Sequence, residues 1–311
     1  MTMGREETPT VTEVRESVDR PTVQNTSQLR VSRSPGQLVL MRLLRSRQSV
    51  VGLTIVALLI LMALLAPIIA PASPTKQDLI NQFIAPGRDH LFGTDEFGRD
   101  IFSRIIYGAR ISLQVGLIAV GIAMVVGTLI GLIGGYYGGW FDMVTQRLIE
   151  IMLAFPGLLL ALAIIAVLGN GIQNVMIAVG VGSVPSYARL VRAQVMAAKE
   201  KDYVEAARAI GARDVRLISK HIFPEVISSL IVLSSLGIAG AILSAAALSF
   251  IGLGAQPPTP EWGAMLSQGR DFLRDQWWIT TFPGIFIAFT VLGFNLLGDG
   301  LRDALDPQGN R

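Results

Sequence analysis

The feature that most constrains this chain is the length of its uncharged apolar runs. Residues from Val50 to Ala70 carry no charge, and none occurs between Ile151 and Ala188. A helix needs roughly 20 apolar residues to cross a membrane. Only 16% of the residues are charged, whereas soluble domains contain about 25%. The sequence therefore predicts an all-α membrane protein and not a soluble domain.

Six runs are long enough to be spans, and the basic residues orient them. The expected spans cover residues 50–70, 111–135, 147–168, 172–190, 226–253 and 277–298. Lys and Arg favour the cytoplasmic side of a membrane. Eight of them precede residue 49 and eight lie between Arg189 and Lys220, whereas the segments on the opposite side hold seven. We therefore expect six transmembrane helices with both termini in the cytoplasm.

Several classes of function lack the residues they need. The chain has no cysteine, and its two histidines lie far apart in sequence, so neither a metal site nor a catalytic set is expected. None of its four lysines follows a glycine, which excludes a phosphate-binding loop of the Gly-Lys-Ser/Thr type. Ion-coupled transporters require an acid or a base inside a span, and these spans carry none between their ends. With a net charge of only +3 and no interleaved aromatics, nucleic-acid binding is not expected.

A charged loop separates the fourth and fifth spans, from Arg189 to Glu225. Acidic side chains are favoured near the N-terminus of a helix. The acidic residues of the loop, the last of which before Gly211 is Glu205, therefore predict that a helix begins there. Gly211 suits the left-handed conformation that ends a helix, and Asp214 begins a second helix. Pro224 marks the entry to the fifth span. The pattern predicts a helix–turn–helix that docks a partner; the alternative is a solvated linker.

Four sequence blocks carry a resemblance to a known family. The loop residues Glu205-Ala206-Ala207, Gly211 and His221 to Pro224 resemble the EAA loop of ABC-importer permeases, although His221 and Phe223 replace its usual Ile and Leu. The other blocks are His90 to Asp100 with Ser103-Arg104 and Tyr107 to Leu113, Leu248 to Gly254 with Trp262-Gly263, and Gly298 to Pro307. Together they resemble the C-type permease subunit of dipeptide and oligopeptide importers over residues 36–308.

The resemblance implies an assembly of several chains. It implies a type I importer fold, a second homologous permease subunit forming a heterodimer, two ATPase subunits that bind ATP and Mg, and an extracytoplasmic binding protein that delivers peptide. It places the chain in the plasma (inner) membrane of a bacterium or archaeon. Related permeases import nickel, glutathione and other small solutes, which leaves the cargo open.

The implied coupling residues are Glu205, Ala206, Ala207, Gly211 and Pro224. The two alanines are expected to allow a close fit to the ATPase. Glu205 either caps its own helix or pairs with a basic group across the interface. No residue is indicated for contact with the substrate.

The chain divides into four expected parts. Residues 1–35 are a disordered cytoplasmic tail, and 36–110 hold the first span and an extracytoplasmic segment. Residues 111–303 are the permease domain, with the coupling loop at 189–225, and 304–311 are a cytoplasmic tail. Residues 36–48 form either a basic helix on the inner membrane surface or only a positive-inside signal.

Three smaller patterns complete the expectations. The glycines at 131, 134, 135, 138 and 139 indicate close helix packing or a turn, because no strand precedes them as a nucleotide loop requires. Ser235, Ala239, Ala246 and Ser249 form a small-residue face that makes either a helix contact or a pore lining. Trp277 and Trp278 are expected in an outer aromatic belt.

Overall fold

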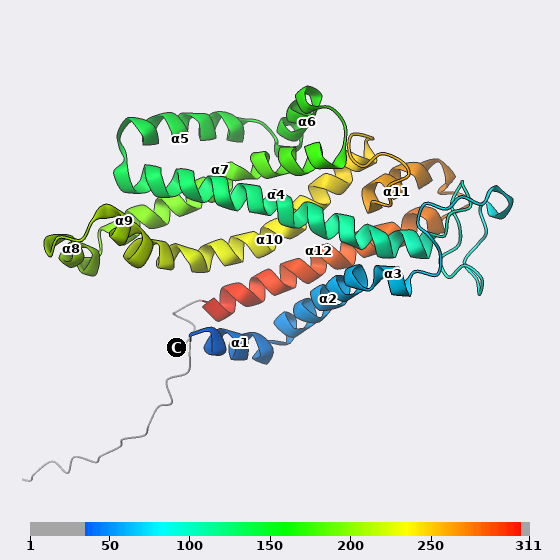
Figure 1. Cartoon of the computed structure of the whole chain (residues 1–311), viewed down its shortest axis with the longest axis horizontal. Coiled ribbons are helices and arrows are strands. Elements are labelled where there is room, and N and C mark those ends of the chain that lie inside the picture. The colour runs from blue at the N-terminus through cyan, green and yellow to red at the C-terminus, as the bar shows by residue number, and fades with distance from the viewer. Residues whose placement is uncertain (1–34, 306–311) are drawn as a thin grey trace, which may run out of the picture. The chain divides into compact units, whose positions relative to one another are not determined.

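The structure, a computed structural model, describes residues 35–305, and its elements are helices (Figure 1). The expectations for residues 1–34 and 306–311 lie outside the described residues. The long helices are α2 (Arg47–Leu64), α4 (Ile101–Tyr137), α5 (Gly139–Ala154), α6 (Gly157–Leu168), α7 (Ile172–Lys199), α10 (Phe223–Phe250) and α12 (Trp278–Leu305). The shorter ones are α1 (Pro35–Arg45), α3 (Ala66–Ile69), α8 (Asp202–Ala209), α9 (Asp214–Leu217) and α11 (Trp262–Gly269). Single turns η2 (Leu79–Asn81) and η4 (Arg270–Phe272) are 3-10, and η3 (Ile218–Ile222) is π-helical.

Four stretches within the described residues are long and apolar enough to cross a membrane by length and composition. They are α2, α4, α12 and the stretch Asp214–Phe250 that ends with α10. The pair α5 and α6 would be a fifth span, bent by 101°. The expected third span, residues 147–168, is therefore not one straight helix, because Phe155 and Pro156 separate its halves.

The second expected span begins earlier than the apolar run suggested. α4 starts at Ile101, where the Asp100 carboxylate caps the helix by accepting the Ser103 N–H at 2.8 Å. The expected division between residues 110 and 111 thus falls inside α4. With 37 residues, α4 is about 55 Å long at 1.5 Å per residue, so it extends beyond a bilayer core.

Glycines bring α4 and α7 into close contact. A Cβ atom at Gly131 would lie 2.7 Å from the Ala188 carbonyl oxygen, and one at Gly135 would lie 2.9 Å from that of Arg192. Small residues allow such approach between membrane helices. Gly138 and Gly139 then turn the chain with φ of +64° and +67°. Both expected roles of the glycine run, packing and turning, are confirmed.

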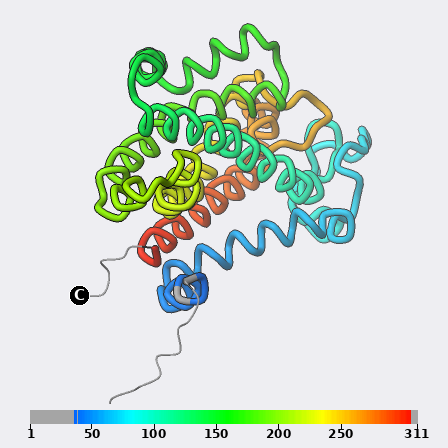
Figure 2. Tube along the Cα trace, turned by 60° about the vertical axis from the view of Figure 1, so that its left-hand side comes forward, coloured from blue at the N-terminus to red at the C-terminus, as the bar shows by residue number. Residues whose placement is uncertain are grey.

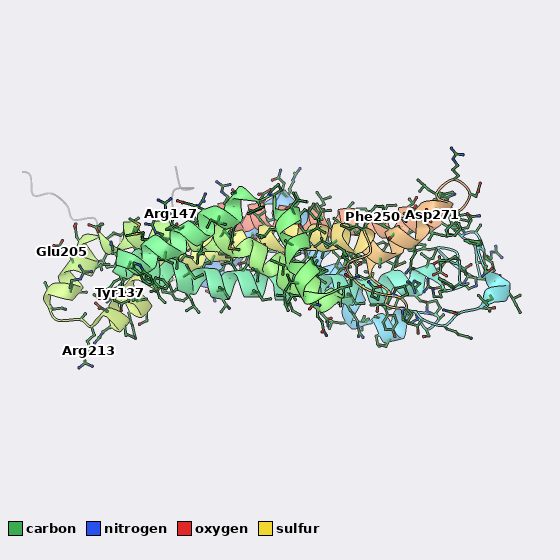
Figure 3. The ribbon with its side chains drawn as sticks, turned by 90° about the horizontal axis from the view of Figure 1, so that it is seen from above. Tyr137, Arg147, Glu205, Arg213, Phe250 and Asp271 are labelled. Carbon is green, nitrogen blue, oxygen red and sulfur yellow. The ribbon has the colours of Figure 1, made fainter. Side chains whose placement is uncertain are left out.

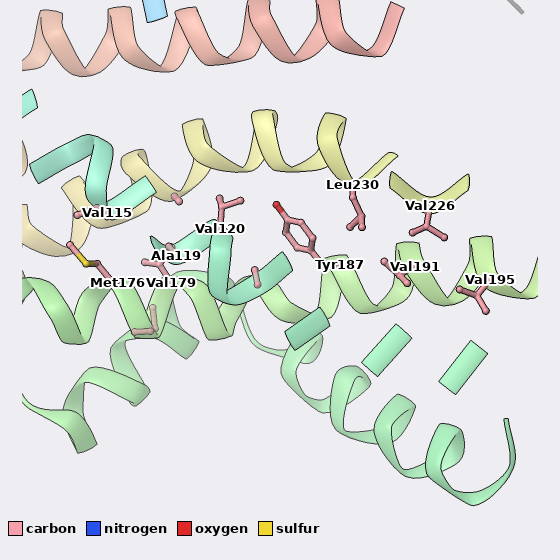
Figure 4. Packing of buried hydrophobic residues seen from close by; sticks show 14 of the residues in the cluster. Val115, Ala119, Val120, Met176, Val179, Tyr187, Val191, Val195, Val226 and Leu230 are labelled. Carbon is pink, nitrogen blue, oxygen red and sulfur yellow. The ribbon is translucent and has the colours of Figure 1, made fainter. Parts of the chain in front are cut away.

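The core lies between α4, α7 and α10 (Figure 4). Tyr187 and Val191 of α7 pack there with Val120 of α4 and Leu230 of α10. A buried side chain makes many van der Waals contacts, and their small dispersion energies add up to a substantial stabilisation. This core connects the charged loop to the spans, because Val204 of α8 belongs to the same cluster.

A second cluster joins α2, the start of α4, α11 and α12. α2 lies along α12 in both views (Figures 1 and 2), and a Cβ at Gly293 would approach Ile55 Cγ2 to 2.6 Å. The small-residue face of α10 is buried, at 8% exposure or less for Ser235, Ala239, Ala246 and Ser249. A Cβ at Gly263 of α11 would approach the Ala246 oxygen to 2.3 Å. That face is a helix contact.

Buried ion pairs hold the segment before α4. Arg99 Nε lies 2.6 Å from Asp95 Oδ2, and both side chains are almost fully buried. Arg104 lies 3.6 Å from the same carboxylate and donates to the Pro74 oxygen at 3.0 Å. Charges are buried only when they are paired and hydrogen-bonded. The block that marked the family resemblance is thus a folded polar core.

The two residues expected in an outer aromatic belt, Trp277 and Trp278, differ in their exposure. Trp277 is 50% exposed, whereas Trp278 is buried and its Nε1 donates to the Thr94 oxygen at 3.2 Å. Trp278 therefore binds the segment before α4 instead of facing lipid. A buried indole N–H usually finds such a partner.

Within the described part of the chain, residues 36–305 belong to one compact unit. At one end of it lie α1, α8, α9 and the last turn of α12; at the other lie α11 and the segment before α4 (Figure 1). Figure 3 shows the same separation, with Glu205 and Arg213 at the end opposite Asp271. The elements expected inside and outside are therefore at opposite ends.

Candidate functional site

The charged loop folds as the predicted helix–turn–helix. α8 covers Asp202–Ala209, and α9 starts at Asp214. Between them Gly211 adopts φ of +87°, and its N–H donates to the Arg208 oxygen at 3.0 Å. The Ala212 N–H reaches back to the Ala207 oxygen at 3.0 Å. This bond pattern ends a helix with a left-handed residue, which is the role expected of Gly211.

The two alanines of the loop face different ways. Ala206 is exposed, whereas Ala207 is only 9% exposed and packs with Val204 in the core cluster. Successive helix residues point about 100° apart, so one of the two must turn inward. The coupling role expected of both alanines stays a prediction, and in the structure the small side chain of Ala207 fits α8 against its own chain.

Glu205 is exposed at the end of the molecule (Figure 3). Among the described residues its carboxylate has no hydrogen-bond or ion-pair partner, and α8 has no side-chain cap. Of the two alternatives for Glu205, capping of its own helix is thus not what the structure shows. The carboxylate is available to a partner.

Two residues at the loop tip were not indicated by the sequence reasoning. Ile210 is 88% exposed and Val215 is 76% exposed, one on each side of Gly211. Exposed apolar surface of sufficient extent marks an interaction site, and these two side chains add apolar surface to a charged loop. Their signal in the sequence was an aliphatic residue on each side of a turn glycine within a charged loop. We call Glu205, Ala206, Ile210 and Val215 the loop tip.

The loop is attached to α10 through Glu225. Lys201 Nζ lies 2.7 Å from its carboxylate, and the Tyr203 hydroxyl donates to the same group and to the His221 oxygen, the latter at 3.3 Å. Burial and the neighbouring Glu225 carboxylate raise the pKa of Tyr203 to about 12, so the hydroxyl keeps its proton near neutral pH. These bonds connect α8 directly to a span.

Glu225 also borders an open groove of about 550 Å³ between α7, α10 and α12. The groove is lined in addition by Leu190, Ser228, Ser229, Val232, Leu233, Leu236, Arg302 and Leu305.

A second attachment of the loop joins α9 to α4, where the Tyr136 hydroxyl donates to Asp214 Oδ1 at 2.6 Å. A displacement of the loop would therefore be passed to two spans.

Pro224 lies where α10 begins, but it does not interrupt the helix. The preceding turn η3 is π-helical, and the Phe223 N–H donates to the Ile218 oxygen five residues earlier. By length and composition, the stretch Asp214–Phe250 counts as one candidate span. Proline lacks the N–H of a regular helix turn, and π-bulges often occur at functional sites.

Within the described residues, no group of three His, Cys, Asp or Glu side chains could hold a metal ion.

Comparison with protein-family models adds the decisive observation. Residues 127–309 match the binding-protein-dependent transport system inner membrane component, and residues 34–86 match the N-terminal TM domain of oligopeptide transport permease C. The chain belongs to the binding-protein-dependent transport permeases. The matched core contains α5 to α12 and the whole charged loop, so this permease has its candidate site within the family's own domain.

Curated relatives align with the permease over most of its length. It is 49% identical over 275 residues to the dipeptide transport system permease protein DppC of Alkalihalophilus pseudofirmus, covering 88% of this chain and 90% of the relative. It is 48% identical over 277 residues to the glutathione transport system permease protein GsiD of Escherichia coli, covering 89% and 91%. The chain is thus similar to permeases of dipeptide and of glutathione transport systems.

A solved structure shares the fold of the permease. An inward-facing form of the MetNI methionine ABC transporter aligns with a TM-score of 0.53 at 18% identity, covering 66% of this chain and 98% of the other. At that identity the likeness concerns the fold. The chain thus shares its fold with a chain of an ABC transporter, in agreement with the sequence resemblance.

Proposed function

We propose that this permease forms half of the translocation route of an ATP-driven peptide importer. Its partner in the membrane is a second, homologous permease, with which it makes a heterodimer. Two ATPase subunits dock on the charged loops of the pair, and an extracytoplasmic binding protein delivers the substrate. The observation that carries the proposal is the loop tip, which is exposed and partly apolar, on a loop attached to two spans.

The energy source lies in the partner chains. The sequence has no phosphate-binding loop, so ATP and Mg bind to the ATPase subunits and this chain performs no catalysis. Closure of the ATPases moves α8 and α9, and the bonds through Glu225 and Asp214 pass the movement to α10 and α4. The spans then alternate between inward-open and outward-open states.

The topology has six spans with both termini in the cytoplasm. The sixth span is α7, whose 28 residues extend about 42 Å at 1.5 Å per residue. Gln173, Asn174 and Arg189 lower its hydropathy, but one side of α7 is buried against α4, so fewer of its residues meet lipid. The cell membrane of a bacterium, or of an archaeon, is the proposed location.

The cargo is proposed to be dipeptides or oligopeptides, following the similarity to DppC. Glutathione is the second candidate, because the similarity to GsiD is nearly equal. Both are peptide-like solutes, and uncharged spans suit solutes of varied side-chain charge. Nickel is a third solute handled by similar machinery and serves as the contrasting probe.

Uptake measurements test the proposal. Cells with and without this gene are given a labelled dipeptide, labelled glutathione or nickel. We expect ATP-dependent dipeptide uptake that disappears on deletion and returns with the intact gene. Unchanged dipeptide uptake with lost glutathione or nickel uptake would replace the cargo. Recovery of a functional oligomer without any ATPase would overturn the coupling mechanism.

A further inference from the structure

The corner between α5 and α6 is the most unusual backbone feature of the proposed spans. The chain bends by 101° at Phe155 and Pro156. The two helices have 16 and 12 residues, about 24 and 18 Å at 1.5 Å per residue, and neither alone crosses a core of about 30 Å. If the pair makes one span, its corner lies at membrane depth.

The contacts of α6 with its neighbouring helices also place the corner at membrane depth. A small cavity of about 80 Å³ separates the start of α6 from α7 and α10, and its walls include Gly157, Val179, Ser183 and Ser244. Ser183 lies eleven residues after the start of α7, and Ser244 lies six residues before the end of α10. The start of α6 is therefore more than a turn inside the ends of both helices.

Three backbone N–H groups just after the corner have no hydrogen-bond acceptor among the described residues. α6 has no side-chain cap, and its first backbone bond joins the Leu160 N–H to the Pro156 oxygen at 3.0 Å. The N–H groups of the three residues before Leu160 have no acceptor among the described residues, as is usual in a first helical turn. Residues 153–159 are all exposed, with Phe155 at 56% and Leu159 at 55%.

Lipid cannot satisfy these groups. Irregular backbone at membrane depth occurs only where protein covers it or water reaches it. A neighbouring transmembrane helix satisfies its own backbone internally and offers few free acceptors, whereas water offers many. Discontinuous helices in other transporters line the route of the substrate.

We propose that the α5–α6 corner lines the water-filled route of the assembled importer, with Phe155 and Leu159 facing the passing solute. This inference rests on the proposed function, because it needs a route formed with the partner permease. It assigns the face of the chain that meets the substrate, which the sequence did not indicate.

The absence of native cysteine allows single-cysteine labelling in the assembled importer in membrane vesicles. Phe155→Cys and Leu159→Cys are treated with a charged, membrane-impermeant methanethiosulfonate. Asp271→Cys, at an exposed outer position, is the water-accessible control, and Leu58→Cys, 60% exposed on α2, is the lipid-facing control. We expect both corner cysteines to react at least about tenfold faster than Leu58→Cys, because an apolar surrounding suppresses the reactive thiolate.

Added dipeptide, binding protein and ATP should slow the reaction at the corner and leave Asp271→Cys unchanged. Corner cysteines that react as slowly as Leu58→Cys, or that are unaffected by the transported solute, would overturn the inference. Should Phe155→Cys fail to assemble, Leu159→Cys decides. Normal uptake and ATPase co-purification with a slow corner cysteine would reject this inference alone, whereas absent ATPase would reject the proposed function.

Discussion

Individual residues show how chemistry is divided between the two ends of this permease. At one end Glu205 and its neighbours leave polar and apolar groups uncovered for a partner. At the other, the Asp95 carboxylate is buried between two arginines that form ion pairs with it, and Arg104 also donates to a backbone oxygen. The first arrangement favours docking, because exposed groups without partners in their own chain can form new contacts with another protein. The second favours a rigid fold, since each charge depends on its partner.

Charge reversal at the loop tip tests docking. We expect Glu205→Lys to abolish uptake while the protein remains inserted, because the exposed carboxylate has no role in its own chain. Gly211→Asp should act similarly, because a side chain at φ of +87° strains the turn that presents the tip. Uptake and membrane fractionation are measured together. Glu150→Lys, an exposed acid on α5, is the control; loss of insertion in the loop variants would indicate a folding role instead.

Removal of one buried charge tests the outer polar core. Asp95→Asn leaves Arg99 and Arg104 without their shared carboxylate, and breaking a buried pair typically costs about 3–5 kcal/mol. We expect a clearly lower unfolding temperature of the purified complex. The exposed Asp89→Asn is the matched control. Equal melting of the two variants would show that this core contributes little.

At the scale of elements, the permease combines a close-packed helix pair with a loop bonded to two spans. α4 and α7 meet through glycines, which let the two backbones lie in close contact. α8 is joined to α10 by the bonds of Lys201 and Tyr203 to Glu225. Such contacts allow the loop and the spans to move together, as transport by alternating access requires.

Neutralising Glu225 should separate ATP hydrolysis from transport. Glu225→Gln removes the ion pair with Lys201, and because that pair is partly exposed, its stability cost should be below about 1 kcal/mol. We expect the ATPase to remain bound and active while uptake falls several-fold. Glu150→Gln breaks a similar exposed pair with Arg147 at 2.8 Å and should have no effect. Proportional loss of hydrolysis and uptake would contradict the anchoring role.

A single methyl group tests the packing of α4 on α7. Gly131→Ala places a Cβ 2.7 Å from the Ala188 oxygen, and such overpacking typically costs about 1–3 kcal/mol. Gly121→Ala in the same helix meets nothing within 4 Å and should not destabilise. Thermal unfolding in detergent compares the two. A lower unfolding temperature only for Gly131→Ala is the expected result; indistinguishable values would mean that the helices shift apart easily.

For the whole molecule, the two ends and the charge distribution agree with one orientation. The charged loop and the end of α12 share one end, and the segment before α4 shares the other with α11 (Figure 1). Within the described residues, most basic residues lie in the segments of the first end, which favours the cytoplasm there. An odd number of spans would separate the loop from one of the termini.

Reporter fusions test this orientation. Green fluorescent protein attached after Arg311 should fluoresce, because it folds in the cytoplasm, and alkaline phosphatase at the same position should be inactive. The converse is expected for fusions after Asp271, which serve as the control for the outer side. Fluorescence at Asp271 together with phosphatase activity at Arg311 would invert the topology.

The sequence by itself determined the class, the family and the form of the loop. Uncharged runs such as Val50 to Ala70 identify membrane helices because charge is costly in lipid. Gly211 ends α8 because few other residues adopt its backbone conformation. These are local properties, and neighbouring residues are enough to state them.

Only the tertiary structure decided how these pieces face one another. The inward turn of Ala207, the bond between Trp278 and Thr94, and the attachment of Lys201 to Glu225 join residues distant in the chain or choose between faces of a helix. The bend at Phe155 and Pro156 lies within an uncharged run, so hydropathy alone did not show it. Such features depend on which surfaces pack together, and hydropathy along a sequence carries no information about the partner across the contact.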